Sequence, residues 1–197
     1  VFIATSLVSV FFILFNRSAE PIFQYFELPA SLPRFICQPW SLITYMFMHA
    51  DFLHILFNML WLYWFGAMFL FFFTNKHLRG LYIFGGLCGG LLYILFYNVF
   101  PYFAGAVGSS LMVGASASIL AIVAAVAYRE PNYTIRLLLI GNVRLKYLAL
   151  FVVLTDLLFL TSSNAGGHIA HLGGALAGVW FAASLNKGVD ITAWIST

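Results

Sequence analysis

Charged side chains are scarce in this sequence: they make up 8% of the 197 residues, whereas hydrophobic residues make up 63%. Soluble domains carry about a quarter charged residues, so this balance excludes an ordinary water-soluble protein and predicts an integral membrane protein. The nine basic residues are scattered among apolar runs. This is typical of topology signals in membrane loops and not of a phosphate-binding surface, so we expect no nucleic-acid partner.

Cysteine and cofactor motifs are also sparse. The two cysteines, Cys37 and Cys88, define neither a disulfide framework nor a CxxC metal-ligand spacing. The HExxH zinc motif is absent. The glycines between residues 85 and 90 lack the basic residue and the helix start of a phosphate-binding loop. We therefore expect no metal, nucleotide or organic cofactor.

Long apolar runs predict six transmembrane helices, because about 20 mostly apolar residues cross a bilayer core of roughly 30 Å. The predicted spans are residues 1–15, 50–73, 80–100, 113–128, 145–162 and 168–186. The segment between the first two contains four prolines and several aromatic residues, which favours a structured loop at the membrane interface. We interpret residues 1–197 as a single all-α polytopic membrane domain, and we expect its first span to be truncated at the N-terminus.

The basic residues predict an orientation. Seven of them lie on one side of the predicted spans: Lys76, Arg79, Arg129, Arg136, Arg144, Lys146 and Lys187. Only Arg17 and Arg34, in the first loop, lie on the other side. The positive-inside rule places the larger set, and the N-terminus with it, in the cytoplasm. We expect a multi-pass protein of a bacterial inner membrane.

Three polar clusters interrupt the apolar pattern: His49-x4-His54-x3-Asn58, Gly114-Ala115-Ser116-Ala117 and Ala170-His171-x2-Gly174-x3-Gly178. Polar groups in hydrocarbon are unfavourable and usually face a bundle interior or a water-filled cavity. The predicted orientation puts each cluster near the outer end of its span, so all three share one depth. Ser116 is expected roughly one turn inside its helix.

Helical spacing relates these side chains to one another. His54 and Asn58 lie one turn apart on one face, and Asp51 is suited to cap their helix and leave His49 in the preceding turn. The small residues that follow His171 favour close packing of spans four and six, which would bring Ser116 toward His171. A serine becomes a nucleophile when a base within hydrogen-bond reach takes its proton.

At these motifs the sequence resembles the rhomboid family of intramembrane serine proteases. The resemblance covers most of the chain: the six spans, the large first loop and all three clusters. It implies Ser116 as the nucleophile and His171 as the general base. It also implies an oxyanion site formed by His54, Asn58 and the backbone N–H groups of Ser116 and Ala115, with supporting roles for His49, Gly114, Gly174 and Gly178.

The same resemblance implies the reaction and its setting. The expected substrates are transmembrane proteins whose helices are easily unwound and carry small residues at the cut site, and the expected surroundings are a lipid bilayer. No oligomeric state follows from the sequence. Three positions depart from the family pattern: Ala117 follows the serine where glycine is common, Leu120 replaces an aromatic residue, and Ser41 replaces arginine after Trp40. Ala117 raises the question whether spans four and six can approach closely.

Other interpretations of the polar residues remain open. His49, His54 and Asn58 could form a metal site with His168 and His171, although no cysteine or carboxylate cluster completes it. His168 lacks the glycine three residues later and is not assigned the base role. Asp156 in span five is the tempting third member of a triad; we interpret it as a helix-packing or solvated residue, since the family works as a dyad.

Two other protein classes compete with the protease. One is a catalytically inactive rhomboid-like protein that binds membrane clients, against which the presence of both Ser116 and His171 weighs. The other is a metal or small-solute transporter, whose inverted repeats and interrupted helices are not apparent in the sequence.

Overall fold

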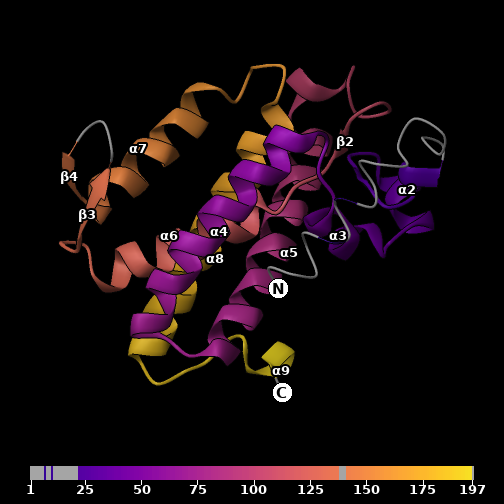
Figure 1. The fold of residues 1–197 in the computed structure, drawn as a ribbon. Coiled ribbons are helices and arrows are strands. Elements are labelled where there is room, and N and C mark those ends of the chain that lie inside the picture. The colour runs from indigo at the N-terminus through magenta and orange to yellow at the C-terminus, as the bar shows by residue number, and fades with distance from the viewer. Residues whose placement is uncertain (1–6, 8–9, 11–21, 138–140, 197) are drawn as a thin grey trace.

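The computed structural model describes residues 7, 10, 22–137 and 141–196. Its largest elements are the helices α4 (Phe52–Phe72), α5 (Asn75–Val99), α6 (Ser116–Arg129), α7 (Leu145–Leu158) and α8 (Ala165–Asn186). In Figure 1, α4, α5, α6 and α8 form one bundle, and α7 diverges from it toward a small hairpin. The prediction of a helical membrane bundle is confirmed.

Three helices of the described residues are long and apolar enough to cross a membrane: α4, α5 and α8. The predicted spans 113–128 and 145–162 correspond to α6 and α7, which have 14 residues each. At 1.5 Å per residue, 14 residues extend only about 21 Å. The predicted span 1–15 lies outside the described residues, except for residues 7 and 10.

The first loop is structured, as predicted. It contains α2 (Leu32–Cys37), α3 (Ser41–Thr44) and the 3-10 helix η1 (Tyr45–Phe47). The indole N–H of Trp40 donates to the carbonyl of Tyr25 at 2.8 Å. Strand β1 (Leu28–Pro29) pairs antiparallel with β2 (Leu111–Met112), so the loop is joined to the segment that leads into α6. Between α5 and β2 lies the 3-10 helix η2 (Pro101–Phe103).

Small residues set the spacing of the central helices. A methyl group at Gly174 would collide with the carbonyl oxygen of Ala117, and one at Gly178 with that of Ala121. The predicted close packing of spans four and six is therefore confirmed. The methyl group of Ala117 faces α5, since a Cβ built on Gly89 would lie 2.7 Å from it. Ala117 thus does not hold α6 and α8 apart.

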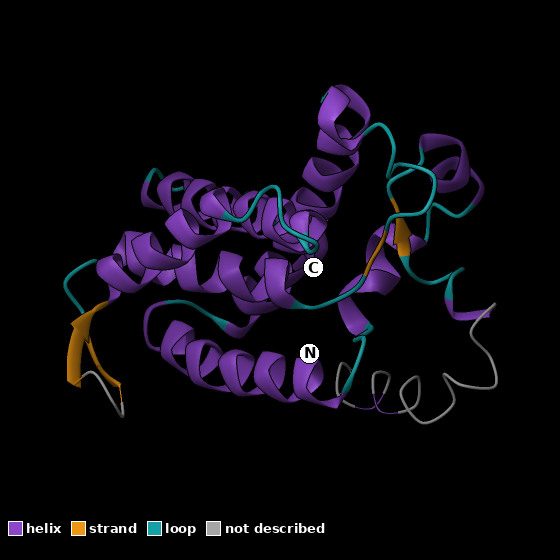
Figure 2. Ribbon diagram, turned by 90° about the horizontal axis from the view of Figure 1, so that it is seen from above, coloured by secondary structure: helices purple, strands orange, loops and turns teal. Residues whose placement is uncertain are grey.

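Strands β3 (Thr134–Leu137) and β4 (Gly141–Arg144) form an antiparallel hairpin between α6 and α7. Figure 2 shows this hairpin on one side of the bundle and the elements of the first loop on the other. The hairpin leads directly into α7, because the last residue of β4 immediately precedes its first turn.

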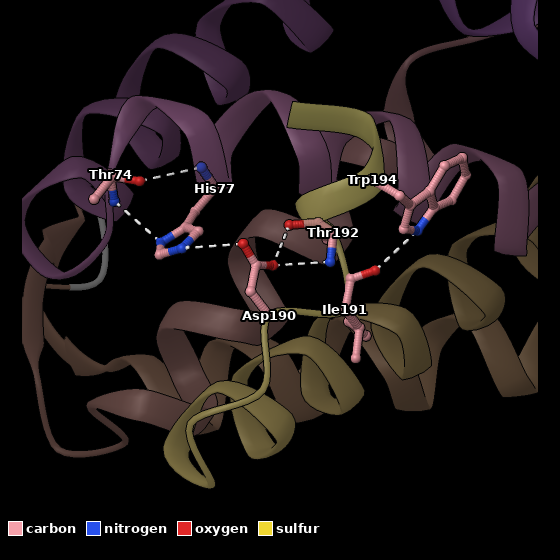
Figure 3. A network of polar contacts seen from close by, with 6 residues as sticks. All are labelled: Thr74, His77, Asp190, Ile191, Thr192 and Trp194. Carbon is pink, nitrogen blue, oxygen red and sulfur yellow. Dashed lines mark hydrogen bonds and ion pairs between the residues drawn. The ribbon is translucent and has the colours of Figure 1, made fainter. Parts of the chain in front are cut away.

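The segment after α8 folds back over the end of the bundle where α5 begins and α8 ends, and it contains α9 (Ala193–Ser196). Thr74 caps α5 by accepting from the backbone N–H of His77. The ring of His77 lies 3.5 Å from a carboxylate oxygen of Asp190, and the other oxygen of Asp190 accepts from the backbone N–H and the hydroxyl of Thr192. Figure 3 shows how this network holds the C-terminal segment against the start of α5.

Candidate active site

A cavity of about 320 Å³ lies between four helices. Asn58 reaches it from α4, Ser116 from α6, Asp156 from α7 and His171 from α8. The rest of its lining is mostly apolar and comes from Phe57, Trp61, Ile119, Leu120, Phe151, Val152 and Thr155. One residue from each of the three sequence clusters therefore faces the same space.

Ser116 is the first residue of α6, and the expectation that it lies one turn inside the helix is wrong. Gly114 has a φ of +129°, a conformation open mainly to glycine. Its backbone N–H donates to the carbonyl of Tyr45 at 2.9 Å, so the chain turns before the helix begins. The first N–H groups of a helix have no intrahelical partner, and the positive end of the helix dipole favours negative charge beside Ser116.

The ring of His54 lies beside this turn. Asp51 accepts from the backbone N–H of His54 at 2.8 Å and caps α4, as predicted. The backbone N–H of Ala50 donates to Nδ1 of His54 at 3.3 Å, which assigns the ring proton to Nε2. A Cβ built on Gly114 would lie 3.0 Å from that Nε2 and 3.6 Å from Oγ of Ser116. The N–H donor of His54 and the hydroxyl of Ser116 therefore both lie close to Gly114.

Asn58 and His49 each contact His54. The side-chain amide of Asn58 donates one N–H to the carbonyl of His54 at 2.8 Å. Asn58 also lines the cavity. His49 is buried, and its ring packs edge-on against that of His54 with centroids 4.9 Å apart. Burial, and then the neighbouring His54, lower the pKa of His49 to about 3, so its ring is neutral at physiological pH.

Asp156 joins α7 to two histidines of α8. The residue is 3% exposed, so of the two interpretations given to it the solvated one is wrong, whereas the helix-packing one agrees with its contacts. One carboxylate oxygen, Oδ1, lies 2.8 Å from Nδ1 of His168 and 2.9 Å from Nδ1 of His171. An acidic residue isolated in an apolar run is the signal that could have identified it, because buried charges need partners.

Ser116 and His171 line the same cavity from two helices. Within the part of the chain that the structure describes, no hydrogen bond joins Oγ of Ser116 to the ring of His171. Nucleophile–base contacts are often long in the absence of substrate and shorten in the substrate complex. Of the two histidines on Asp156, only His171 lines the cavity with the serine.

The candidate metal ligands in the structure differ from those that the sequence suggested. Asp156, His168 and His171 offer ligand atoms within 4.8 Å of one another, so a carboxylate does complete a candidate set, and His49 and His54 are not part of it. In this geometry each histidine Nδ1 is already hydrogen-bonded to the carboxylate. The direct contacts therefore satisfy these donors without an ion.

Comparison with known proteins identifies the family. Residues 37–187 match the model of the Rhomboid domain. The chain belongs to the rhomboid family. It is 31% identical over 158 residues to the RHOMBOID-like protein 12, mitochondrial, of Arabidopsis thaliana, an alignment that covers 75% of this rhomboid and 47% of the relative. The chain thus spans about half the length of that curated relative.

Proposed function

We propose that this rhomboid is an intramembrane serine endopeptidase that hydrolyses peptide bonds of transmembrane substrates. The observation that carries the proposal is the shared cavity, which Ser116 and His171 line from two different helices beside Asn58. Membership of the rhomboid family supports the same class of reaction. The proposed active unit is a single membrane domain that needs no cofactor.

In the proposed reaction, Oγ of Ser116 attacks the scissile carbonyl carbon while Nε2 of His171 accepts the hydroxyl proton. The C–N bond then breaks, and His171 passes the proton to the leaving amine. Water hydrolyses the resulting ester with His171 again as the base. The negative oxygen would be held by the Nε2–H of His54, the amide of Asn58 and the backbone N–H groups of Ser116 and Ala115. Removing one such donor typically lowers kcat by about 10²–10³-fold.

The cavity supports a particular kind of substrate. Its volume of about 320 Å³ is at the lower end of ligand pockets, which extend over about 300–1,000 Å³. This size suits a short extended segment with small side chains. The carbonyl groups of an intact transmembrane helix are already paired. The substrate would therefore have to unwind before its carbonyl meets Ser116.

A second candidate is a rhomboid-like protein that binds membrane clients without cutting them. It is favoured by the absence, among the described residues, of a hydrogen bond between Ser116 and His171. The relative's printed name, RHOMBOID-like, is compatible with either candidate. The difference between them is chemical turnover at Ser116.

The deciding experiment is cleavage of a helix-destabilised single-span substrate in proteoliposomes. Ser116→Ala and His171→Ala should each lower the rate by at least about 10³-fold, and a fluorophosphonate should label the wild type at Ser116. The matched control is Ser118→Ala, which removes another hydroxyl of α6 that is buried and has no hydrogen-bond partner among the described residues. Wild-type cleavage by Ser116→Ala would refute the protease. Substrate binding by an uncleaving wild type would establish the client-binding protein.

The orientation and the membrane are also proposals. At the end of the bundle away from the cavity, the Arg129 side chain hydrogen-bonds Asn186, and Lys187 follows directly. We propose that this basic end faces the cytoplasm or its organellar equivalent and that the cavity opens on the opposite side. The relative's name includes the word mitochondrial, so the inner membranes of bacteria and of mitochondria are both candidates. A reporter fused after Lys187 that is active only outside would overturn this orientation.

A further inference from the structure

Asp156 is a buried acid at the candidate site to which the proposed reaction gives no role. Its carboxylate is withdrawn from solvent on α7. An unpaired buried carboxylate is strongly unfavourable, and hydrogen bonds from charged or polar partners offset this. Both donors come from α8, where His168 and His171 lie one turn apart. The two histidine rings therefore stabilise the Asp156 carboxylate within the apolar helix.

The contact defines where the proton of His171 lies. An ionised carboxylate only accepts hydrogen bonds, so the nitrogen 2.9 Å from Oδ1 must carry the hydrogen. In the neutral ring, Nε2 is then the nitrogen with the free lone pair. That nitrogen is the one able to accept a proton from a serine. The unaided imidazole in water populates both tautomers, and here the carboxylate selects one of them.

We infer that Asp156 is a positioning residue for the base, so that Asp156, His171 and Ser116 act together as a triad in the proposed reaction. Asp156 holds Nδ1–H of His171, turns Nε2 toward the cavity, and stabilises the imidazolium that forms when the serine proton is transferred. The inference rests on the proposed function for its catalytic meaning. The tautomer that it assigns to His171 is a property of the protein alone.

His168 shares the same acceptor. Its Nδ1 lies 2.8 Å from Oδ1, its ring stacks on Phe159 with centroids 5.8 Å apart, and the second oxygen of Asp156 has no hydrogen-bond partner among the described residues. Two donors on one oxygen compete. Removing His168 should therefore strengthen the hold on His171, which is the opposite of what removing the carboxylate does.

The test combines kinetics with a measurement of the tautomer in the full chain. Asp156→Asn keeps the shape and can donate to Nδ1, so it should lower kcat by about 10²–10⁴-fold, leave KM within a few-fold, and slow fluorophosphonate labelling of Ser116 in parallel. Asp156→Glu should recover part of the loss. The matched control is Asp190→Asn, which changes an aspartate whose carboxylate lies beside the ring of His77 at the far end of the bundle, and it should cleave at the wild-type rate.

Nitrogen NMR of ¹⁵N-histidine-labelled protein reads the tautomer without any turnover. The His171 signal, identified by its loss in His171→Ala, should show a protonated Nδ1 in the wild type and in His168→Gln, and a mixed or Nε2-protonated ring in Asp156→Asn. A wild-type His171 protonated on Nε2 would overturn the inference, as would wild-type kcat in Asp156→Asn. Because the signal needs no activity, an inactive protein with Nδ1–H on His171 would refute the protease and leave only the tautomer assignment standing.

Discussion

Replacing Gly174 by alanine tests whether the spacing of α6 and α8 governs the chemistry. Besides its collision with the carbonyl oxygen of Ala117, the added methyl group would lie 2.8 Å from the carbonyl carbon and 3.1 Å from Cα of that residue, whereas carbon atoms pack at about 3.5–4.0 Å. The clash is with backbone, which cannot rotate away, so the helices must separate by more than half an ångström. Overpacking of this kind costs about 1–3 kcal/mol.

The stability loss should nevertheless be small, because alanine in a helix gains about 1 kcal/mol over glycine. Activity is far more sensitive, since Gly174 follows His171 by one turn and a misplacement of about 1 Å can lower a rate about 10²-fold. We expect Gly174→Ala to cleave about 10²-fold more slowly while its free energy of unfolding in detergent falls by no more than about 2 kcal/mol.

Gly66→Ala is the matched control for this substitution, because a methyl group on that α4 glycine would meet no atom within 4 Å. It should be as stable as the wild type or slightly more so, and it should cleave normally. The assays are proteoliposome cleavage and denaturant unfolding of the same preparations. Wild-type cleavage by Gly174→Ala, or equal losses in both variants, would refute the reasoning.

Three further predictions concern other parts of the site. The pKa of His49 is lowered to about 3 in the folded protein, so between that pH and about 6.5 the unfolded chain binds a proton that the folded chain does not. The free energy of unfolding should therefore fall on acidification by up to about 1.4 kcal/mol per pH unit. His49→Gln should remove this slope between pH 7 and 5, and parallel plots of unfolding free energy against pH for the variant and the wild type would contradict the prediction. Gly114→Ala should lose most of its cleavage activity, because a φ of +129° strains an alanine by about 1–3 kcal/mol and the added Cβ would press on the ring of His54. Gly108→Ala is the control, since a Cβ there meets no atom within 4 Å, and it should cleave normally. Full activity of the Gly114 variant would count against His54 as an oxyanion donor. EDTA should leave cleavage unchanged, because no ion takes part in the proposed reaction, and a loss that zinc restores would favour the metal interpretation.

The long helices of this chain could be predicted from the sequence, because hydropathy alone marks them. The apolar runs of α4, α5 and α8 exceed the length of a membrane crossing, so composition alone locates them. The shorter α6 and α7 were overextended in the predictions, because apolar residues also occupy the turn before Ser116 and the loop after Leu158. Hydropathy is insensitive to backbone conformation, and it therefore misses the turn at Gly114 that separates strand β2 from the start of α6.

The candidate site shows the same division. Helical periodicity correctly put His54 and Asn58 on one face, and the small residues after His171 correctly predicted close packing of α8 on α6. The contact of Asp156 with His168 and His171 could not be predicted in this way. It depends on how α7 crosses α8, which is set by packing between helices and leaves no periodic trace in either sequence.

The pairing of β1 with β2 has a practical consequence for chimeric proteins. Leu28 and Met112 are partners across this ladder, and the carbonyl of Tyr45 holds the N–H of Gly114. The loop outside the bundle and the turn that presents Ser116 are therefore one structural module encoded by two distant stretches of sequence. An exchange of the first loop with that of another rhomboid should succeed only when residues 111–114 are exchanged with it.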